Sequence, residues 1–307
     1  MRRATAAAAL LLALSFLPGC HGPRAAGPPA AAGPTGTPPA YPATAGIMEG
    51  WDTPAPPRRL FGTTWYVGTC GITALLVTSP QGHILIDGGT PAAGAAIAAN
   101  IQALGFRLGD IRVLLNSHEH ADHAGGLAYL QRASGAPLLA RAPAMDALRR
   151  GTSAPGDPQS GVLERFPAIA DVRPLADGQV VRVGETAVTA HAAPGHAPGG
   201  TSWTWTACEA RTCLRMAYVD SLSAATDADY RFSDHPGYLA AFRRSLDRTA
   251  ALPCDVLLSP HPLAVDLPAR LAGQAPLAEA GACSRHSALA RRALDQRLRA
   301  ETGGAGR

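Results

Sequence analysis

Four metal-capable side chains lie within six consecutive positions: His118, His120, Asp122 and His123. Imidazole nitrogen and carboxylate oxygen are the ligands that zinc takes, and two residues two positions apart on extended backbone point the same way. A polar loop would account for a single His-x-His, because solvated histidines are common in loops. Four potential ligands this close together predict a metal site instead, with Glu119 turned away from it in a structural role.

The residues around this cluster predict its place in a fold. Residues 111–116 form a short apolar run rich in branched side chains, which is typical of a buried strand. Residues 124–126 read Ala-Gly-Gly, and a helical periodicity follows them. The cluster is therefore expected in the loop that leaves the C-terminal end of a strand and enters a helix, where α/β sheets usually place their chemistry.

The composition limits the classes of protein to which this chain can belong. A length of 307 residues suits one large α/β domain preceded by a leader, and 47% hydrophobic residues are enough for a large core. The net charge of +4 is modest, and the sequence has no basic patch with interleaved aromatic residues, so a nucleic-acid partner is not expected. All 27 basic residues are Arg. Without Lys there is no Walker lysine, no Schiff base and no Ser-x-x-Lys nucleophile.

Residues 1–20 are predicted to be a signal peptide. Two Arg residues precede an apolar run, 6–17, that is too short to span a membrane. The leader ends in Leu-Pro-Gly-Cys, which resembles a bacterial lipobox with Cys20 as the lipidated residue, although Pro18 is unusual there and ordinary cleavage nearby is the alternative. Residues 21–46, rich in Pro, Ala and Gly, predict a disordered tether. The catalytic domain would then cover 47–307, in the periplasm.

The rest of the chain predicts two successive runs of strands and helices. Strands are expected at 64–67, 72–78, 83–86, 111–116, 138–141, around 172, and at 180–183, 186–191, 202–206, 214–219 and 255–259. Helices are expected at 91–104, 127–132, 144–150, 236–251 and 284–300. Strands in both runs end in loops that carry a histidine, His196 in the second run and His261 near its end. This order predicts an α/β fold, a four-layer αβ/βα sandwich of two mixed sheets flanked by helices.

The six cysteines fit an oxidising compartment. Two of them, Cys208 and Cys213, flank a tight polar turn and could staple a hairpin. Cys254 and Cys283 flank the segment that carries His261 and could form a second disulfide. Four cysteines allow three connectivities, so these pairs are hypotheses. Cys70 is expected to be a small buried hydrophobic residue.

The order of several short motifs resembles the metallo-β-lactamase superfamily. Those motifs are Asp-Gly-Gly at 87–89, H-x-H-x-D-H at 118–123, Pro-Gly-His at 194–196 and Pro-His-Pro at 260–262. Four further segments look like the third subclass of class B β-lactamases: Tyr-Val-Gly-Thr at 66–69, Gly-His-Ile-Leu-Ile-Asp-Gly-Gly at 82–89, Gly-His-Ala-Pro-Gly-Gly-Thr-Ser-Trp at 195–203 and Asp-Ser-Leu-Ser at 220–223. The resemblance runs from about residue 51 to about residue 300.

The resemblance implies two zinc ions, bridged by a water or hydroxide. The first zinc would take His118, His120 and His196, and the second would take Asp122, His123 and His261. Asp122 would also be catalytic, because it would accept a hydrogen bond from the bridging hydroxide and so orient it.

The segment after Val219 is where the resemblance leaves a choice. Ser221 and Ser223 would bind the substrate carboxylate in place of a missing Lys. In related hydrolases of the glyoxalase-two type, an Asp at the position of Asp220 bridges both metals. The closer resemblance implies instead that Asp220 is turned away.

The implied activity is zinc-dependent hydrolysis of the amide bond of β-lactam antibiotics by a monomer, conferring antibiotic resistance. The alternatives are another di-zinc hydrolase of this fold, acting on a thioester, lactone or phosphodiester, and a non-catalytic zinc-binding lipoprotein. Two interpretations are open for Trp51 and the loop 151–159, which either wall the pocket or have an ordinary surface role. The histidines His83, His191, His235 and His286 are expected to be surface or packing residues.

Overall fold

The computed structural model describes residues 46–303. The predicted signal peptide at 1–20, the lipidation site Cys20 and all but the last residue of the predicted tether at 21–46 lie outside the described residues. Among the helices of residues 46–303, none combines the length and the apolarity that a membrane crossing needs.

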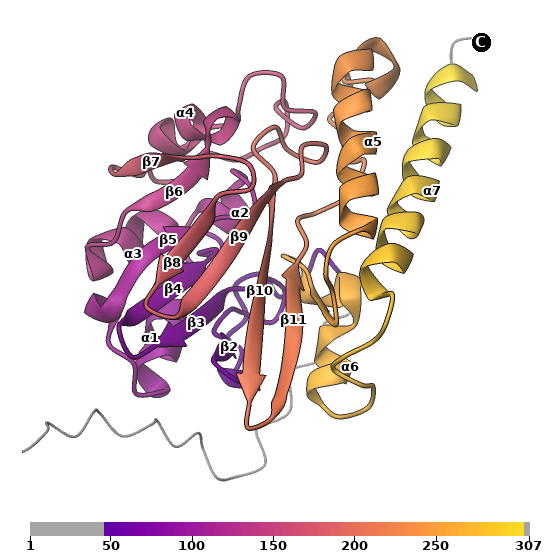
Figure 1. The fold of residues 1–307 in the computed structure, drawn as a ribbon. Helices are drawn as coiled ribbons and strands as arrows, with labels where there is room; N and C mark the ends of the chain where they lie inside the picture. Colours follow the sequence, from indigo (N-terminus) through magenta and orange to yellow (C-terminus); the bar gives the residue numbers. More distant parts are fainter. Residues whose placement is uncertain (1–45, 304–307) are drawn as a thin grey trace, which may run out of the picture. The chain divides into compact units, whose positions relative to one another are not determined.

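The first sheet contains seven strands that lie in the order of the sequence, β1 to β7 (Figure 1). The first four pair antiparallel, and β4 to β7 pair parallel, so the sheet is mixed. Their bounds are β1 Arg58–Phe61, β2 Thr64–Tyr66, β3 Leu75–Ser79, β4 Gly82–Ile86, β5 Ile111–Leu115, β6 Leu138–Arg141 and β7 Val172–Leu175.

The second sheet contains five strands in the order β12-β11-β10-β9-β8. The pairs are antiparallel except that β12 runs parallel to β11, so this sheet is mixed too. Its strands are β8 Val180–Val183, β9 Thr186–Ala192, β10 Thr201–Glu209, β11 Thr212–Tyr218 and β12 Val256–Leu258.

Helices cover the outer face of each sheet. The first sheet is covered by α1 (Ala93–Ala103), α3 (Leu127–Ser134) and α4 (Ala142–Arg150), and the second by α5 (Pro236–Ala250) and α7 (Ala282–Gly303) (Figure 1). Two short helices, α2 (Ala121–Ala124) and α6 (Leu267–Leu271), and three 3₁₀ turns (Leu108–Asp110, Phe232–Asp234 and Pro262–Val265) lie in the connections.

Alternate residues of the strands build the layers, because successive side chains of a strand point to opposite faces. In β4, Leu85 belongs to the apolar cluster under α1 and α3, whereas Ile84 and Ile86 belong to the cluster between the sheets. In β11, Ala217 faces the helices, and Met216 packs between the sheets. Both sheets are therefore buried on both faces, and the expected four-layer sandwich is confirmed.

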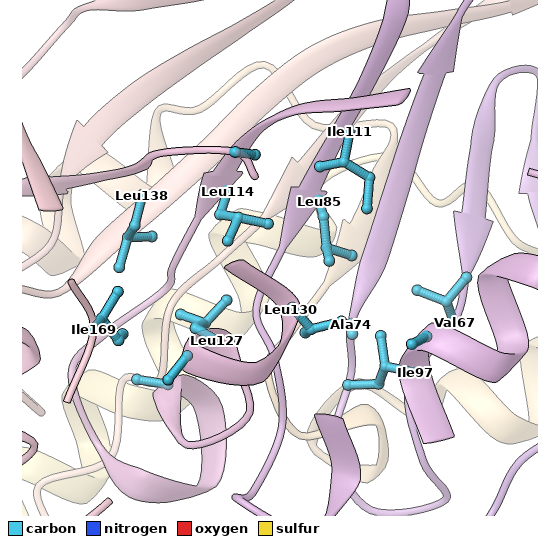
Figure 2. Packing of buried hydrophobic residues seen from close by; sticks show 14 of the residues in the cluster. Val67, Ala74, Leu85, Ile97, Ile111, Leu114, Leu127, Leu130, Leu138 and Ile169 are labelled. Carbon is cyan, nitrogen blue, oxygen red and sulfur yellow. The ribbon is translucent and has the colours of Figure 1, made fainter. Parts of the chain in front are cut away.

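The cluster under the helices fixes the ends of the metal loop. Figure 2 shows Leu85 and Leu114 of the sheet near Ile97 of α1 and Leu127 of α3. All four side chains are fully buried, and each such burial stabilises the fold by about 1.5–3 kcal/mol. Because Leu114 precedes the loop and Leu127 follows it, the loop 116–126 is held at both ends by the core.

Some elements differ from the expectation. Helix α1 begins two residues later than predicted, and α7 is longer at both ends. The strand β1 was not predicted, because it has only four residues and the buried Arg58 interrupts its apolar alternation. A register shift between Arg59 and Phe61 further breaks its pairing with β2. Helix α6 has five residues, too few to show a periodicity.

Within residues 46–303 the structure contains two disulfides, in the pairing that the sequence favours. Cys208–Cys213 closes the hairpin of β10 and β11, and Cys254–Cys283 ties α7 to the residue two positions before β12. Cys70 is a free, buried thiol, and its sulfur lies 3.3 Å from the carbonyl oxygen of Pro54.

We predict that the two disulfides stabilise the fold unequally. The Cys254–Cys283 bond spans 29 positions and the Cys208–Cys213 bond spans 5. From loop-closure entropy, the double substitution Cys254→Ser/Cys283→Ser should lower the free energy of unfolding by about 3–4 kcal/mol, and Cys208→Ser/Cys213→Ser by about 2 kcal/mol. Denaturant titration of both variants measures the difference. A larger loss from the short-loop pair would contradict this account.

Candidate metal centre

The predicted metal ligands come from both sheets and meet at one site. His118 and His120 follow β5, Asp122 and His123 lie in α2, His196 follows β9, and His261 follows β12. These six residues are distributed over more than 140 positions of the sequence. The sandwich brings them together because their strands end at the same edge of the fold.

Asp87 fixes the direction in which the metal loop leaves the first sheet. It follows β4 with a φ of 66°, a left-handed conformation that is uncommon for a residue with a side chain. Its buried carboxylate accepts hydrogen bonds from the Ser117 backbone amide (2.6 Å), the Ser117 hydroxyl (2.7 Å) and the Tyr218 hydroxyl (2.6 Å). Burial raises the pKa of Asp87, although these contacts and His123 oppose the rise. A strained backbone and a shared carboxylate therefore hold the start of the loop.

His118, His120 and His196 form one tight cluster. One nitrogen of each ring lies within 4.8 Å of one nitrogen of the others. The ring centroids of His118 are 4.6 Å from His120 and 4.8 Å from His196. All three side chains are buried. Three imidazoles converging in this way match the three protein ligands of a catalytic zinc.

Buried carboxylates decide which nitrogen of two of these rings can face a metal. His118 Nδ1 donates to Asp220 Oδ1 at 2.7 Å, and its buried Nε2 has no partner among the described residues. His120 Nε2 lies 2.9 Å from Asp157 Oδ2, which leaves Nδ1 for a metal. A carboxylate on the far nitrogen fixes the tautomer and the ring orientation of a ligating histidine. The sequence interpretation missed Asp157, because an Asp in a loop rich in Gly, Pro and Ser has no distinguishing pattern.

The two serines predicted to bind the substrate lie in different surroundings. Ser221 lines the cleft in front of the histidines. Ser223 lines the same cleft, and its hydroxyl is 2.8 Å from His196 Nδ1. That contact would orient the ring of His196 in the way that Asp220 orients the ring of His118.

Asp122, His123 and His261 form the second cluster. Asp122 Oδ2 lies 3.0 Å from His123 Nε2 and 3.4 Å from His261 Nε2. Neither nitrogen of His123 has a well-aligned hydrogen bond among the described residues, and both are buried. A carboxylate oxygen this close to two imidazole nitrogens fits a shared zinc ion. His118 also has a nitrogen within 4.8 Å of ligand atoms of Asp122 and His123, so the two clusters are adjacent.

The electrostatics of three of the ligands, His118, His196 and Asp122, suit metal binding. Burial and the neighbouring histidines lower the pKa of His118 and of His196 well below the usual value. Burial alone would raise the pKa of Asp122, but His123, His261 and His118 hold it well below its usual range. These two imidazoles are thus neutral and the carboxylate is ionised at neutral pH, which is the protonation state that zinc ligands need.

Asp220 and Glu119 lie behind the ligands. Asp220 is fully buried, and its Oδ1 lies 2.7 Å from His118 Nδ1, which leaves His118 Nε2 for a metal. Burial raises its pKa well above the usual value. Glu119 is also fully buried, and Oε1 accepts the Gly199 amide at 2.9 Å. Glu119 therefore ties the loop that carries His196 to the loop that carries His118 and His120, which is a structural role.

The clusters open into a cleft of about 910 Å³. His120, Asp122, His196, His261 and Ser221 are among its lining residues, and large apolar side chains line it as well: Ile47, Met48, Trp51, Val162, Leu163, Leu222 and Leu289. Of the two interpretations of Trp51 and the loop 151–159, the pocket wall is confirmed. The Trp51 ring lies 5.7 Å from the ring of His261, and the end of the loop 151–159 contributes Gln159.

The remaining histidines lie outside both clusters. His83 packs against Phe106, His191 hydrogen-bonds Thr204 at 2.7 Å, and His235 stacks on Tyr230. His286, expected at the surface or in packing, lines the cleft from α7.

Comparison with known proteins points to one family. The pattern of the metallo-beta-lactamase superfamily matches residues 67–209. The structure is similar to that of the metallo-beta-lactamase MIM-1 from Novosphingobium pentaromativorans, at 50% identity and a TM-score of 0.83, over 84% of this chain and 95% of that one. It is also similar to MEM-A1, a subclass B3 metallo-beta-lactamase from a soil metagenome library, at 45% identity and a TM-score of 0.80, over 83% and 99%.

A more distant relative is a hydroxyacylglutathione hydrolase of Anaeromyxobacter dehalogenans (strain 2CP-C). It is 31% identical over 156 residues, which are 51% of this chain and 48% of that protein. The chain thus aligns with about half the length of this curated relative.

We predict two zinc ions per chain, because two clusters with three protein ligands each are present. Asp122→Ala should remove a ligand of the second cluster and reduce the content to about one zinc per chain. His191→Ala, outside both clusters, is the control and should retain both ions. Metal analysis after dialysis measures the content. Two tightly held zinc ions in the Asp122 variant would contradict this ligand assignment.

Proposed function

The chain belongs to the metallo-beta-lactamase superfamily, and we propose that it is a zinc-dependent β-lactamase that opens the amide bond of β-lactam antibiotics and so confers resistance. The observation that carries the proposal is that the His118, His120 and His196 cluster and the adjacent Asp122, His123 and His261 cluster meet at one cleft, which Ser221 also lines. The similarity to MIM-1 and MEM-A1, over nearly the whole of each, supports the same activity.

The residues of the site have separate roles in hydrolysis. Zinc held by the two clusters supplies a water whose pKa is lowered to about 7 and an electrophile for the amide carbonyl. The ionised carboxylate of Asp122 accepts a hydrogen bond from the attacking water and orients it. His118 and His196 stay neutral, because burial and their neighbours lower their pKa values, so they remain available as ligands. No covalent enzyme intermediate is needed.

The substrate carboxylate is held by hydroxyl groups. The chain has no Lys, and no Arg lines the part of the cleft that the described residues form. Ser221 is placed on the cleft wall beside the metal ligands. A hydrogen bond to a charged group contributes about 1.5–3 kcal/mol, part of which water can supply instead.

The apolar lining favours substrates with bulky apolar side chains. Four of the large hydrophobic side chains that are exposed on the described surface line this cleft: Ile47, Met48, Val162 and Leu289. Exposed apolar side chains gathered at one cleft mark a binding surface. We therefore expect penicillins and cephalosporins with aromatic side chains to bind better than those with small polar ones.

Hydrolysis of a thioester is the second candidate, favoured by the similarity to a hydroxyacylglutathione hydrolase over half the chain. In that type of hydrolase, an Asp at the position of Asp220 would bridge the metals. Here Asp220 Oδ1 is bound to His118 Nδ1. This contact supports the β-lactamase.

We further propose that the protein is exported and tethered to the membrane through a lipidated Cys20, and that it acts as a monomer in the periplasm. The leader pattern in residues 1–20 supports export. Two disulfides also suit an oxidising compartment.

The purified protein should hydrolyse a chromogenic cephalosporin. A zinc chelator should abolish turnover, and added zinc should restore it. Clavulanate should have no effect, since the chain contains no Ser-x-x-Lys nucleophile. A glutathione thioester is the comparison substrate. Turnover of the thioester without turnover of the cephalosporin would favour the second candidate.

The two serines should give different kinetic effects. Ser221→Ala should raise KM by about 10-fold and leave kcat and zinc content unchanged, because it removes one hydrogen bond to the substrate carboxylate. Ser223→Ala should weaken zinc binding, because its hydroxyl contacts His196. Steady-state kinetics and metal analysis measure both effects. Loss of zinc from the Ser221 variant would show that Ser221 belongs to the metal site.

A further inference from the structure

We propose that Asp157 is a positioning residue that couples the loop over the cleft to the first zinc site through His120. The proposal rests on the zinc site of the proposed function and adds a residue outside the two ligand clusters. Asp157 lies in the loop between α4 and β7, in a stretch without regular secondary structure.

Both oxygens of Asp157 are engaged, by donors of different kinds. Oδ2 lies 2.9 Å from His120 Nε2, and Oδ1 accepts the backbone amide of Gln159 at 2.8 Å. Asp157 is only 1% exposed. Burying its carboxylate would be unfavourable without both hydrogen-bond partners. One carboxylate therefore sets the ring of a metal ligand and the path of the loop together.

The same loop reaches over the first cluster. The Gln159 side-chain nitrogen lies 3.5 Å from both ring nitrogens of His196. A second anchor holds the loop from outside, where Asp227 accepts the Gly161 amide at 2.9 Å and donates its own amide to the Pro158 carbonyl at 2.8 Å. Of these two anchors, Asp157 touches a metal ligand and Asp227 does not.

This difference has a physical consequence. The partner of His118 is Asp220, which directly follows the Val219 residue of the core. The partner of His120 is carried by a loop. If the loop shifts, His120 loses the acceptor that fixes its tautomer and makes it a stronger ligand. Zinc affinity and loop position are then linked, and by reciprocity zinc binding must hold the loop in place.

The test is Asp157→Asn, with Asp227→Asn as the matched control. Asn offers one acceptor oxygen to two donors, so either His120 or the Gln159 amide loses its partner whichever way the amide turns. Zinc affinity, measured by competition with a chromophoric chelator, should fall about 10- to 100-fold in Asp157→Asn. The visible spectrum of the cobalt(II)-substituted protein should change as well. Both readouts should be unchanged in Asp227→Asn, which retains the contact with His120.

A double-mutant cycle with His120→Ala tests the route. If Asp157 acts through His120, Asp157→Asn should cause no further loss of zinc affinity in the His120→Ala background. Additive losses would overturn the proposal, and so would an equal loss in Asp227→Asn. Wild-type affinity in both Asp157→Asn and Asp157→Ala would overturn it too.

Two features keep this outcome clear. First, the rise in melting temperature on adding zinc is measured for each variant against its own metal-free form. A general loss of stability therefore cannot be mistaken for a loss of zinc affinity. Second, the measurements use zinc and cobalt without any β-lactam, so they do not depend on the proposed activity. A protein whose zinc affinity depends on Asp157 through His120 but that leaves β-lactams intact would contradict the proposed function alone.

Discussion

Four carboxylates are buried behind the ligands, and the rest of the site depends on their pairing. Asp87, Glu119, Asp157 and Asp220 are each at most 1% exposed. A buried carboxylate is costly unless donors satisfy it. Here the donors are the loops and rings of the site itself, so each carboxylate holds a backbone amide or an imidazole. The same pairing that offsets the cost of burial also sets the positions of the ligands.

The geometry of the site therefore depends on both sheets of the sandwich. The metal loop leaves the first sheet, and His261 arrives from the second. Between the sheets, Tyr218 of β11 donates to Asp87 at the end of β4, so one hydrogen bond joins the two sheets at the base of the site. A change that shifts one sheet against the other would therefore move His196 and His261 away from the other ligands of their clusters before it unfolded either sheet.

The cleft has a polar floor and apolar walls. The floor is made of buried histidines that are fixed by carboxylates, whereas the walls come from a long loop, the N-terminal segment and α7. Rigid placement suits ligands that must orient a water, since catalysis depends on preorganisation. Apolar walls on separate segments suit substrates that share one reacting amide and differ in their side chains. Specificity can then vary while the chemistry stays the same.

The sequence by itself indicated the metal loop and the layers, and its resemblance to a known family implied six candidate ligands. Dense spacing marks His118, His120, Asp122 and His123, and apolar runs mark the strands, because both are local signals. Only the tertiary structure decided that Asp157 pairs with His120 and that the cleft includes a face of α7. Those contacts join segments 37 or more positions apart, and a lone polar residue in a loop carries no periodicity that predicts its partner. Local patterns therefore specify ligands and elements, whereas the packing of the two sheets and the loop decides what orients them.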